Sequence, residues 1–265
     1  RWTFFLRRGV KWSDVQPFTS ADIAYWWEHE QLCEELTGKS VSDLMLIHGQ
    51  RGEVITDPDD PYRVTFAFPI PNGIFLAQAA SYAGAHMLNS PAHYRRRFHP
   101  LLGDQALIER GMAAAKLPNK RALYTHISAW NNPHHPRLWP WVVRKYSASP
   151  PYTAVRNPYY WMVDTAGNQL PYIDQVMSEQ VSQDMVAIRA AAGGVSVQSR
   201  YIGYDQYTYL MSMRQTGKYE VFHWYAGDRS WFVIQPNLNR HTDPAHPDWA
   251  KKRALMREPA FRQAM

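Results

Sequence analysis

The sequence predicts a mixed α/β protein, with an α+β first half and an α/β second half. In the second half, alternating strand-like segments and helix-like segments follow one another as strand, helix, strand, helix, strand, an order that favours a sheet with helical crossovers. In the first half, strands and helices are not regularly interleaved. The 265 residues are 45% hydrophobic and 20% charged, which is the globular range and enough for a sizeable core.

Aromatic content is high, at 14%, with 11 Trp and 16 Tyr. Such residues build cores, and because Trp and Tyr carry one polar edge they also line ligand clefts. The net charge of +6 is spread along the chain, with tight basic runs only at 95–97 and 251–253, so no nucleic-acid partner is predicted. Cys33 is the single cysteine, which excludes an internal disulfide.

In the first half, residues 1–10 alternate as a strand with Trp2, Phe4 and Leu6 on one face. Thr19 and Asp22 have the spacing of a capping box, which predicts a helix that begins there and runs to about Leu36. Further along, the pattern predicts strands at 53–56 and 62–68, a short helix at 74–83, and helical pieces over 91–130 that break at Pro100, Gly103 and Pro118.

The proline-rich loop 131–136 predicts a domain boundary. After it, the pattern predicts strands at 139–146, 152–156, 195–198, 219–225 and 231–239, and one that ends near Val181. Helices are predicted at 183–192, where Met185, Ile188 and Ala192 form one stripe, at 204–215, and from Pro247 onward with an interruption at Pro259. Gly193-Gly194 is expected to end the first of these helices.

Six segments resemble the family 5 solute-binding proteins of ABC importers, the peptide- and oligopeptide-binding group. They occur in the family's order across nearly the whole chain. The segments are Thr3-Phe-Phe-Leu-Arg-Arg-Gly-Val-Lys-Trp-Ser-Asp14, Pro17-Phe-Thr-Ser-Ala-Asp-Ile23, Tyr62-Arg-Val-Thr-Phe-Ala-Phe68, Arg156-Asn-Pro-Tyr-Tyr-Trp161, Asp164-Thr-Ala-Gly-Asn-Gln-Leu-Pro-Tyr-Ile-Asp174 and Phe261-Arg-Gln-Ala264.

The resemblance implies a periplasmic-binding-protein-like fold of two hinged lobes with an additional α+β domain. Residues 1–136 would form the additional domain, 137–240 lobe I, and 241–265 the start of lobe II. The chain would be an internal piece that lacks the N-terminal export segment and most of the second lobe, and would bind ligand poorly by itself.

The resemblance further implies a non-enzymatic role without a cofactor, in which the lobes close on an oligopeptide and deliver it to an ABC transporter permease. We expect a monomer in the periplasm or another extracytoplasmic space, held at the membrane only through a lipid anchor upstream. The many Trp and Tyr residues would equally suit an oligosaccharide, because sugar rings stack on aromatic side chains.

The sequence departs from the family pattern at three places. Val15 stands where the family usually has Gly, so a turn that needs positive φ would be strained there. Ala192-Gly-Gly-Val-Ser196 replaces Ala-Gly-Glu-Ile-Asp, which removes two acidic groups. Glu258-Pro-Ala260 stands where the family usually has Asp-Val-Arg before Phe-Arg-Gln-Ala, and Pro259 suits the first turn of a helix.

The resemblance places one candidate ligand-binding segment near the hinge, facing the cleft. It comprises Gln198, Ser199, Arg200 and Tyr201, whose amide, guanidinium and phenol can bind peptide backbone or a carboxylate. The alternative is an ordinary polar turn between a strand and a helix. Trp231 and Gln235 share a face of the expected strand and could offer a stacking plate and an amide, but the favoured alternative is that Trp231 packs in the core.

Other conspicuous residues are given structural roles. Arg156-Asn-Pro158 is expected to form a loop that locks the sheet, because Pro158 fixes φ and biases Asn157 toward extended geometry. Tyr159, Tyr160 and Trp161 are given a structural role there, although they could instead form a ligand platform. Trp26 and Trp27 are expected to pack in the core, and His134 and His135 to lie in solvent. His29 and Cys33, at i and i+4, could face the same way on a helix, which leaves a metal-dependent hydrolase as a hypothesis from another class. They do not form the two-histidine motif of zinc proteases, and we predict no metal site.

Overall fold

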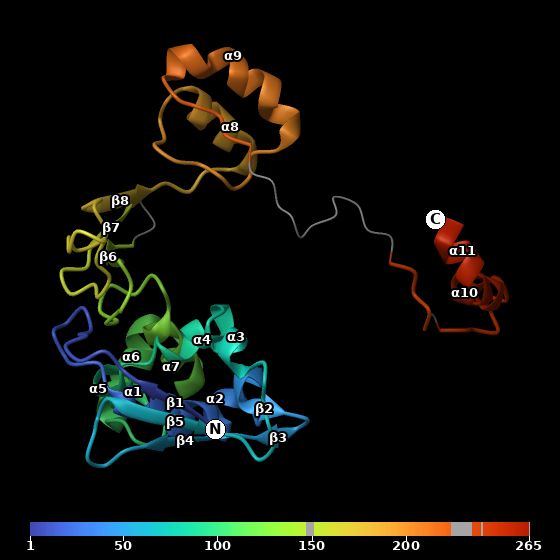
Figure 1. Cartoon of the computed structure of the whole chain (residues 1–265). Helices are drawn as coiled ribbons and strands as arrows, with labels where there is room; N and C mark the ends of the chain where they lie inside the picture. The colour runs from blue at the N-terminus through green and yellow to red at the C-terminus, as the bar shows by residue number, and fades with distance from the viewer. Residues whose placement is uncertain (147–150, 224–234, 240, 265) are drawn as a thin grey trace. The chain divides into compact units, whose positions relative to one another are not determined.

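The structure is a computed structural model that describes residues 1–146, 151–223, 235–239 and 241–264 (Figure 1). The chain divides into two compact units, Arg1–Val181 and Ser182–Met265. The predicted boundary between the additional domain and lobe I, at residue 136, lies inside the first unit. It stays a prediction about the domains of the whole protein. In the described residues, no helix is both long and apolar enough to cross a membrane.

The first unit contains a three-stranded antiparallel sheet in the order β1-β5-β4. Its strands are β1 (Trp2–Phe5), β4 (Glu53–Thr56) and β5 (Arg63–Ala67), all within the predicted ranges. Phe4 lies opposite Val64, and Val54 opposite Phe66, so the apolar residues of all three strands share one face. A small antiparallel hairpin of β2 (Leu46–Ile47) and β3 (Gln50–Arg51) directly precedes β4 in the sequence.

Helix α1 (Ser20–Tyr25) begins at the predicted capping box. The Thr19 hydroxyl accepts from the Ala21 amide, and the Asp22 carboxylate accepts from the Thr19 amide, which satisfies two free amides at the helix start. The single helix predicted to Leu36 is wrong. A π-helical turn η1 (Trp26–Gln31) follows, the backbone is extended at Cys33, and a separate helix α2 (Glu34–Thr37) begins there.

The remaining helices of the first unit are short. Those over 91–130 break near Pro100, Gly103 and Pro118, as predicted. The single helix predicted at 74–83 is wrong, because one helix ends at Ala79 and the next begins at Tyr82. In chain order the remaining helices are η2 (Asp43–Met45), α3 (Phe75–Ala79), α4 (Tyr82–Met87), α5 (Ala92–Arg95), η3 (Arg96–Phe98), α6 (Gln105–Ala115) and α7 (Lys120–Ser128).

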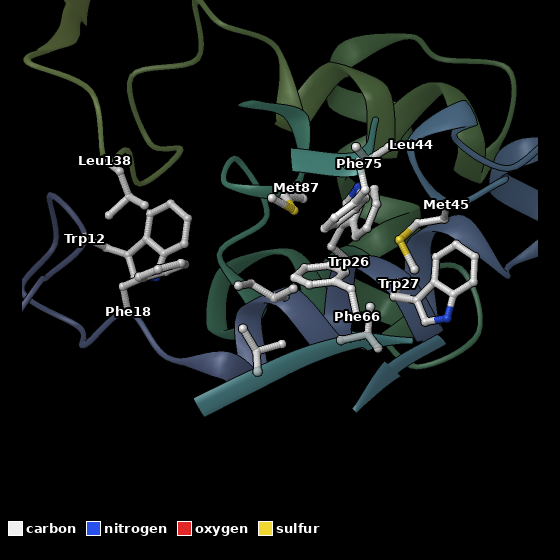
Figure 2. Close-up of a cluster of buried hydrophobic side chains, with 13 residues drawn as sticks. Trp12, Phe18, Trp26, Trp27, Leu44, Met45, Phe66, Phe75, Met87 and Leu138 are labelled. Atoms are coloured by element: carbon white, nitrogen blue, oxygen red, sulfur yellow. The ribbon is translucent and has the colours of Figure 1, made fainter. Parts of the chain in front are cut away.

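The main core of the first unit lies between the apolar face of the β1-β5-β4 sheet and α1, η1, η2, α3 and α4. Ile108 of α6 and Leu123 and Ile127 of α7 form a second, smaller cluster. Figure 2 shows Phe66 from β5, Phe75 from α3 and Trp26 from η1 side by side. At the other end of the main core, Leu138 packs with Trp12 and Phe18. The loop that follows α7 is therefore anchored on the N-terminal segment by apolar burial.

A second antiparallel sheet, in the order β6-β7-β8, completes the first unit. Its strands β6 (Trp141–Lys145), β7 (Tyr152–Arg156) and β8 (Gln175–Ser178) match the prediction. Buried Asn157 follows β7 and donates its Nδ2 to the carbonyls of Arg137, at 3.3 Å, and Trp139, at 3.0 Å. The Arg-Asn-Pro segment thus holds the loop before β6 in place, which is the locking role expected for it.

In the second unit, α8 (Gln183–Ala191) and α9 (Tyr207–Gly217) pack against each other. The other helices are η4 (Tyr204–Gln206), α10 (Asp248–Arg257) and α11 (Pro259–Ala264), and α11 begins at the predicted proline. The predicted stripe on α8 is wrong, because Val186, Ala187 and Ala191 are buried while Met185 and Ile188 are exposed.

The strands predicted for the second unit are absent from its described residues. Residues 195–198, 219–223 and 235–239 are turns or irregular segments, and the rest of the last two predicted strands lies outside the described residues. A strand needs a partner that completes its backbone hydrogen bonds, and no described segment pairs with any of the three. The mixed helix-and-strand class stands, but the alternation of strand and helix is not found here.

Candidate ligand-binding surface

The four predicted residues of the segment 198–201 lie together in an exposed turn between α8 and η4. The side-chain amide of Gln198 donates to the carbonyl of Arg200 at 2.6 Å, which closes the turn. Tyr201 has a φ of 60°, a left-handed conformation uncommon for an aromatic residue, and its side chain is 61% exposed. The turn therefore presents a guanidinium and a phenol to solvent from a preformed backbone.

Arg200 forms no ion pair with any residue that the structure describes. Its guanidinium is exposed and always charged, and its planar set of donors matches a carboxylate. The chemistry expected for the segment is thus available, and its contact with a ligand stays a prediction.

Two tyrosines beside the turn form a stacked pair that the sequence did not single out. The rings of Tyr204 and Tyr207 are 5.6 Å apart at 3°, and the ring of His223 stands edge-on to Tyr207 at 5.1 Å and 88°. Tyr204 is 72% exposed. Their i, i+3 spacing at a helix start was the available signal, because such residues are neighbours on a helix surface.

The second predicted pair is only partly described. Gln235 is exposed in an irregular segment, and Trp231 lies outside the described residues. Whether the two side chains face the same way stays a prediction.

The aromatic run 159–161 lies in the first unit, where it lines two adjoining cavities. One, of about 430 Å³, is walled mainly by apolar groups. It is lined by Arg7, Val10, Phe18, Ala85, Leu88, Leu138, Trp139, Pro140, Tyr160 and Trp161. The second, of about 340 Å³, is polar and shares Arg7, Val10, Tyr160 and Trp161 with the first, and adds Arg8, Gly9, Lys11, Pro158, Tyr159 and Gln169.

Trp26 and Trp27 are buried in the core, as predicted. His29 and Cys33 do not share a helix face, because the π-turn and the extended backbone at Cys33 intervene. The ring of His29 packs against Tyr25 and His99, and Cys33 is buried. Within the described part of the chain, no group of three or more His, Cys, Asp or Glu side chains is arranged to hold a metal ion.

His134 is exposed as predicted, but His135 is buried, so the prediction for the second histidine is wrong. Its Nδ1 donates to the carbonyl of Pro136 at 2.8 Å, and its ring packs edge-on against Tyr94. Burial, together with the nearby charges of Arg137 and Arg95, lowers the pKa of His135 to about 2.

Comparison with known proteins adds a family match. The model of the bacterial extracellular solute-binding proteins, family 5 Middle, matches residues 1–265. A periplasmic alpha-galactoside-binding protein of Rhizobium meliloti (strain 1021) is 30% identical over 208 residues, which is 73% of this chain and 26% of that protein.

Among solved structures, one described as the oligopeptide-binding protein OppA is 30% identical, with a TM-score of 0.72 over 99% of this chain and 40% of that one. The periplasmic binding protein MelB of Agrobacterium fabrum C58, solved with stachyose, is 19% identical, with a TM-score of 0.57 over 99% of this chain and 36% of that one, and it shows the fold alone. The chain thus spans 26% to 40% of these relatives.

Proposed function

This chain belongs to family 5 of the bacterial extracellular solute-binding proteins, the solute-binding components of ABC importers, and from that membership we propose that the whole protein captures an oligopeptide between two lobes and delivers it to a permease. The chemistry is non-catalytic. Binding energy favours the closed form of the hinge, and the permease takes ligand from that form.

The observation that carries the peptide proposal is the preformed turn at 198–201 with an unpaired guanidinium. A peptide brings a terminal carboxylate, which Arg200 can bind with charge-assisted hydrogen bonds. The amide of Gln198 and the hydroxyl of Ser199 supply further donors and acceptors for peptide backbone. The similarity to a protein described as oligopeptide-binding, at 30% identity, supports the same class.

An oligosaccharide is the second candidate, favoured by a different pair of observations. The relative named for alpha-galactosides is also 30% identical. The stacked Tyr204 and Tyr207 leave one ring largely open to solvent, and the apolar face of a sugar ring can stack on such a surface. In this case the aromatic pair, and not the guanidinium, would carry the affinity.

Calorimetry on the whole protein separates the two, with trialanine and the α-galactoside raffinose as probes. For a peptide ligand we expect heat with trialanine and about a tenfold loss of affinity in Arg200→Gln, while Arg214→Gln, an exposed arginine on α9, binds as the parent does. Heat with raffinose alone, lost in Tyr204→Ala and kept in Arg200→Gln, would overturn the peptide proposal in favour of the sugar.

We also propose an extracytoplasmic location, in the periplasm where the organism has one, with membrane association only through an upstream lipid anchor. The protein is proposed to act as a monomer, with 1–136 as the additional domain, 137–240 as lobe I and 241–265 as the start of lobe II. The alpha-galactoside-binding relative and MelB are both described as periplasmic, which supports the compartment. Cell fractionation tests the location, and light scattering on the purified protein tests the oligomeric state.

A further inference from the structure

We propose that the two adjoining cavities of the first unit form one binding site for a small aromatic carboxylate, separate from the surface at 198–201. An apolar chamber of about 430 Å³ opens beside a cationic chamber of about 340 Å³. Arg7 and Trp161 line both. A ligand with a flat apolar body and one anionic end is the class that fits such a pair of chambers.

The lining of the apolar chamber favours a ligand with a flat, apolar body. Trp139, Trp161 and Tyr160 supply aromatic walls, and Leu88 and Leu138 supply aliphatic ones. Its volume lies within the range of small-molecule sites, about 300–1,000 Å³. A sugar fits poorly there, because its hydroxyl groups would lose water without gaining hydrogen-bond partners from these side chains.

The positive charge of Arg7 favours a ligand whose polar end is negatively charged. Its Nη1 donates to the Trp161 carbonyl at 3.1 Å, and its guanidinium carbon lies 5.5 Å from the centroid of the Trp161 ring. Among the residues that the structure describes, no carboxylate pairs with Arg7. Its neighbour Arg8, by contrast, is bonded to Asp60 at 3.0 Å.

A second cation reinforces this charge. Lys11 lines the polar chamber, with its ammonium nitrogen 5.8 Å from the centroid of the Tyr159 ring, and no described carboxylate pairs with it. Two unpaired cations beside an aromatic chamber favour an anion through charge-assisted hydrogen bonds. Gln169 adds an amide to the same wall, but its Nε2 already donates to the carbonyls of Pro158 and Tyr160.

The first test changes only the ligand. Calorimetry on the whole protein compares indole-3-acetate with indole-3-acetamide, which has nearly the same shape but no charge, and with acetate, which has the charge but no aromatic body. We expect the acid to bind at least about tenfold more tightly than the amide, and acetate not to bind. Equal affinity for acid and amide, or no binding of the acid, would overturn the proposal.

The second test changes the protein. Arg7→Gln is expected to bring the affinity for the acid down to that for the amide, while Arg63→Gln, which breaks an exposed ion pair with Asp57 outside both chambers, leaves it unchanged. Ala85→Phe is expected to fill the apolar chamber and abolish binding, and Ala85→Ser, which keeps the space, to preserve it.

Trialanine and raffinose serve as controls for independence from the proposed function. Each is expected to bind Ala85→Phe as it binds the parent, and indole-3-acetate is expected to bind whether or not either of them binds. Binding of the acid that persists in both Arg7→Gln and Ala85→Phe would place it elsewhere and refute this site.

Discussion

Arg95 and Glu30 form an ion pair inside the first unit, with Nη1 of Arg95 2.6 Å from one carboxylate oxygen of Glu30 and 2.7 Å from the other. Their side chains are 11% and 8% exposed. The hydroxyls of Ser90 and Tyr124 also donate to the carboxylate, so a charge carried on η1 is fully surrounded by donors. The pair ties η1 to α5 and α7.

We predict that Arg95→Met lowers the free energy of unfolding by about 3 kcal/mol, because it leaves Glu30 buried without its counter-charge. Arg63→Met is the matched control, since Arg63 pairs with Asp57 at the surface and such pairs contribute at most about 1 kcal/mol. Urea unfolding of both variants measures the difference. Equal losses would show that burial of the pair has no effect.

Val15 has a φ of 77°, so a β-branched residue occupies the left-handed conformation that the turn requires. The amide of Val15 donates to the carbonyl of Trp12 at 2.9 Å, which holds the turn closed. We predict that Val15→Gly raises the free energy of unfolding by about 1 kcal/mol, since the relief of strain exceeds the added freedom of the unfolded chain. As a control, Val143→Gly in β6 should lower stability. A destabilised Val15→Gly protein would contradict this.

His135 makes stability depend on pH. Its pKa is near 2 in the folded protein and near 6.5 in the unfolded chain, so the unfolded state binds the proton first as pH falls. The neutral histidine stabilises the fold fully above pH 6.5, and this contribution declines as pH falls from 6.5 toward 2. His99, whose pKa burial also lowers, adds a loss of the same sign.

We predict that His135→Asn, which keeps a donor for the Pro136 carbonyl but does not titrate, flattens the decline in stability between pH 7 and pH 5 by up to about 1.4 kcal/mol per pH unit. His126→Asn, at an exposed histidine, should leave the decline unchanged. Denaturant unfolding at several pH values measures it. Parallel curves for His135→Asn and the parent would refute the assignment.

Gly193 permits the close packing of α8 against α9. Its φ is 71°, and a Cβ there would lie 2.7 Å from the carbonyl oxygen of Gly217. We predict that Gly193→Ala lowers the free energy of unfolding by about 2 kcal/mol or more, through both strain and overpacking. Gly194→Ala is the control, because its nearest contact would be 3.3 Å and its φ is not positive. Equal costs in a thermal melt would disprove the packing role.

Substitution of Tyr204 tests whether the surface beside the 198–201 turn binds ligand. We predict that Tyr204→Ala weakens an oligosaccharide ligand about tenfold and a peptide ligand less, because the exposed ring stacks on apolar faces. Tyr209→Ala, at an exposed tyrosine of α9, is the control. Calorimetry decides, and an unchanged affinity for both ligand classes would remove Tyr204 from the binding surface.

The candidate site was predictable only in part. The turn at 198–201 was found through a family resemblance, and the structure shows its four residues together and exposed. The Tyr204–Tyr207 stack was missed, although its spacing was visible, because i, i+3 aromatics are more often core than surface. The approach of Arg7 to Trp161, 154 residues apart, had no local signal at all.

Features that depend only on neighbours along the chain could be predicted from the pattern of amino acids. The capping box at Thr19, the alternation of β1 and β5, the helix start at Pro259 and the family motifs are all local patterns, and local hydrogen bonds and side-chain direction suffice to read them.

The tertiary structure alone decided where helices stop and which faces they bury. The helix that begins at Ser20 changes to a π-turn at Trp26 and stops before Cys33 without a proline or glycine, and α8 buries Val186 and not Met185. Both outcomes depend on packing partners that are distant in sequence. The strands predicted at 195–198 and 219–223 would likewise need partner strands from elsewhere in the chain. Burial free energy depends on what lies opposite, which a local pattern does not contain.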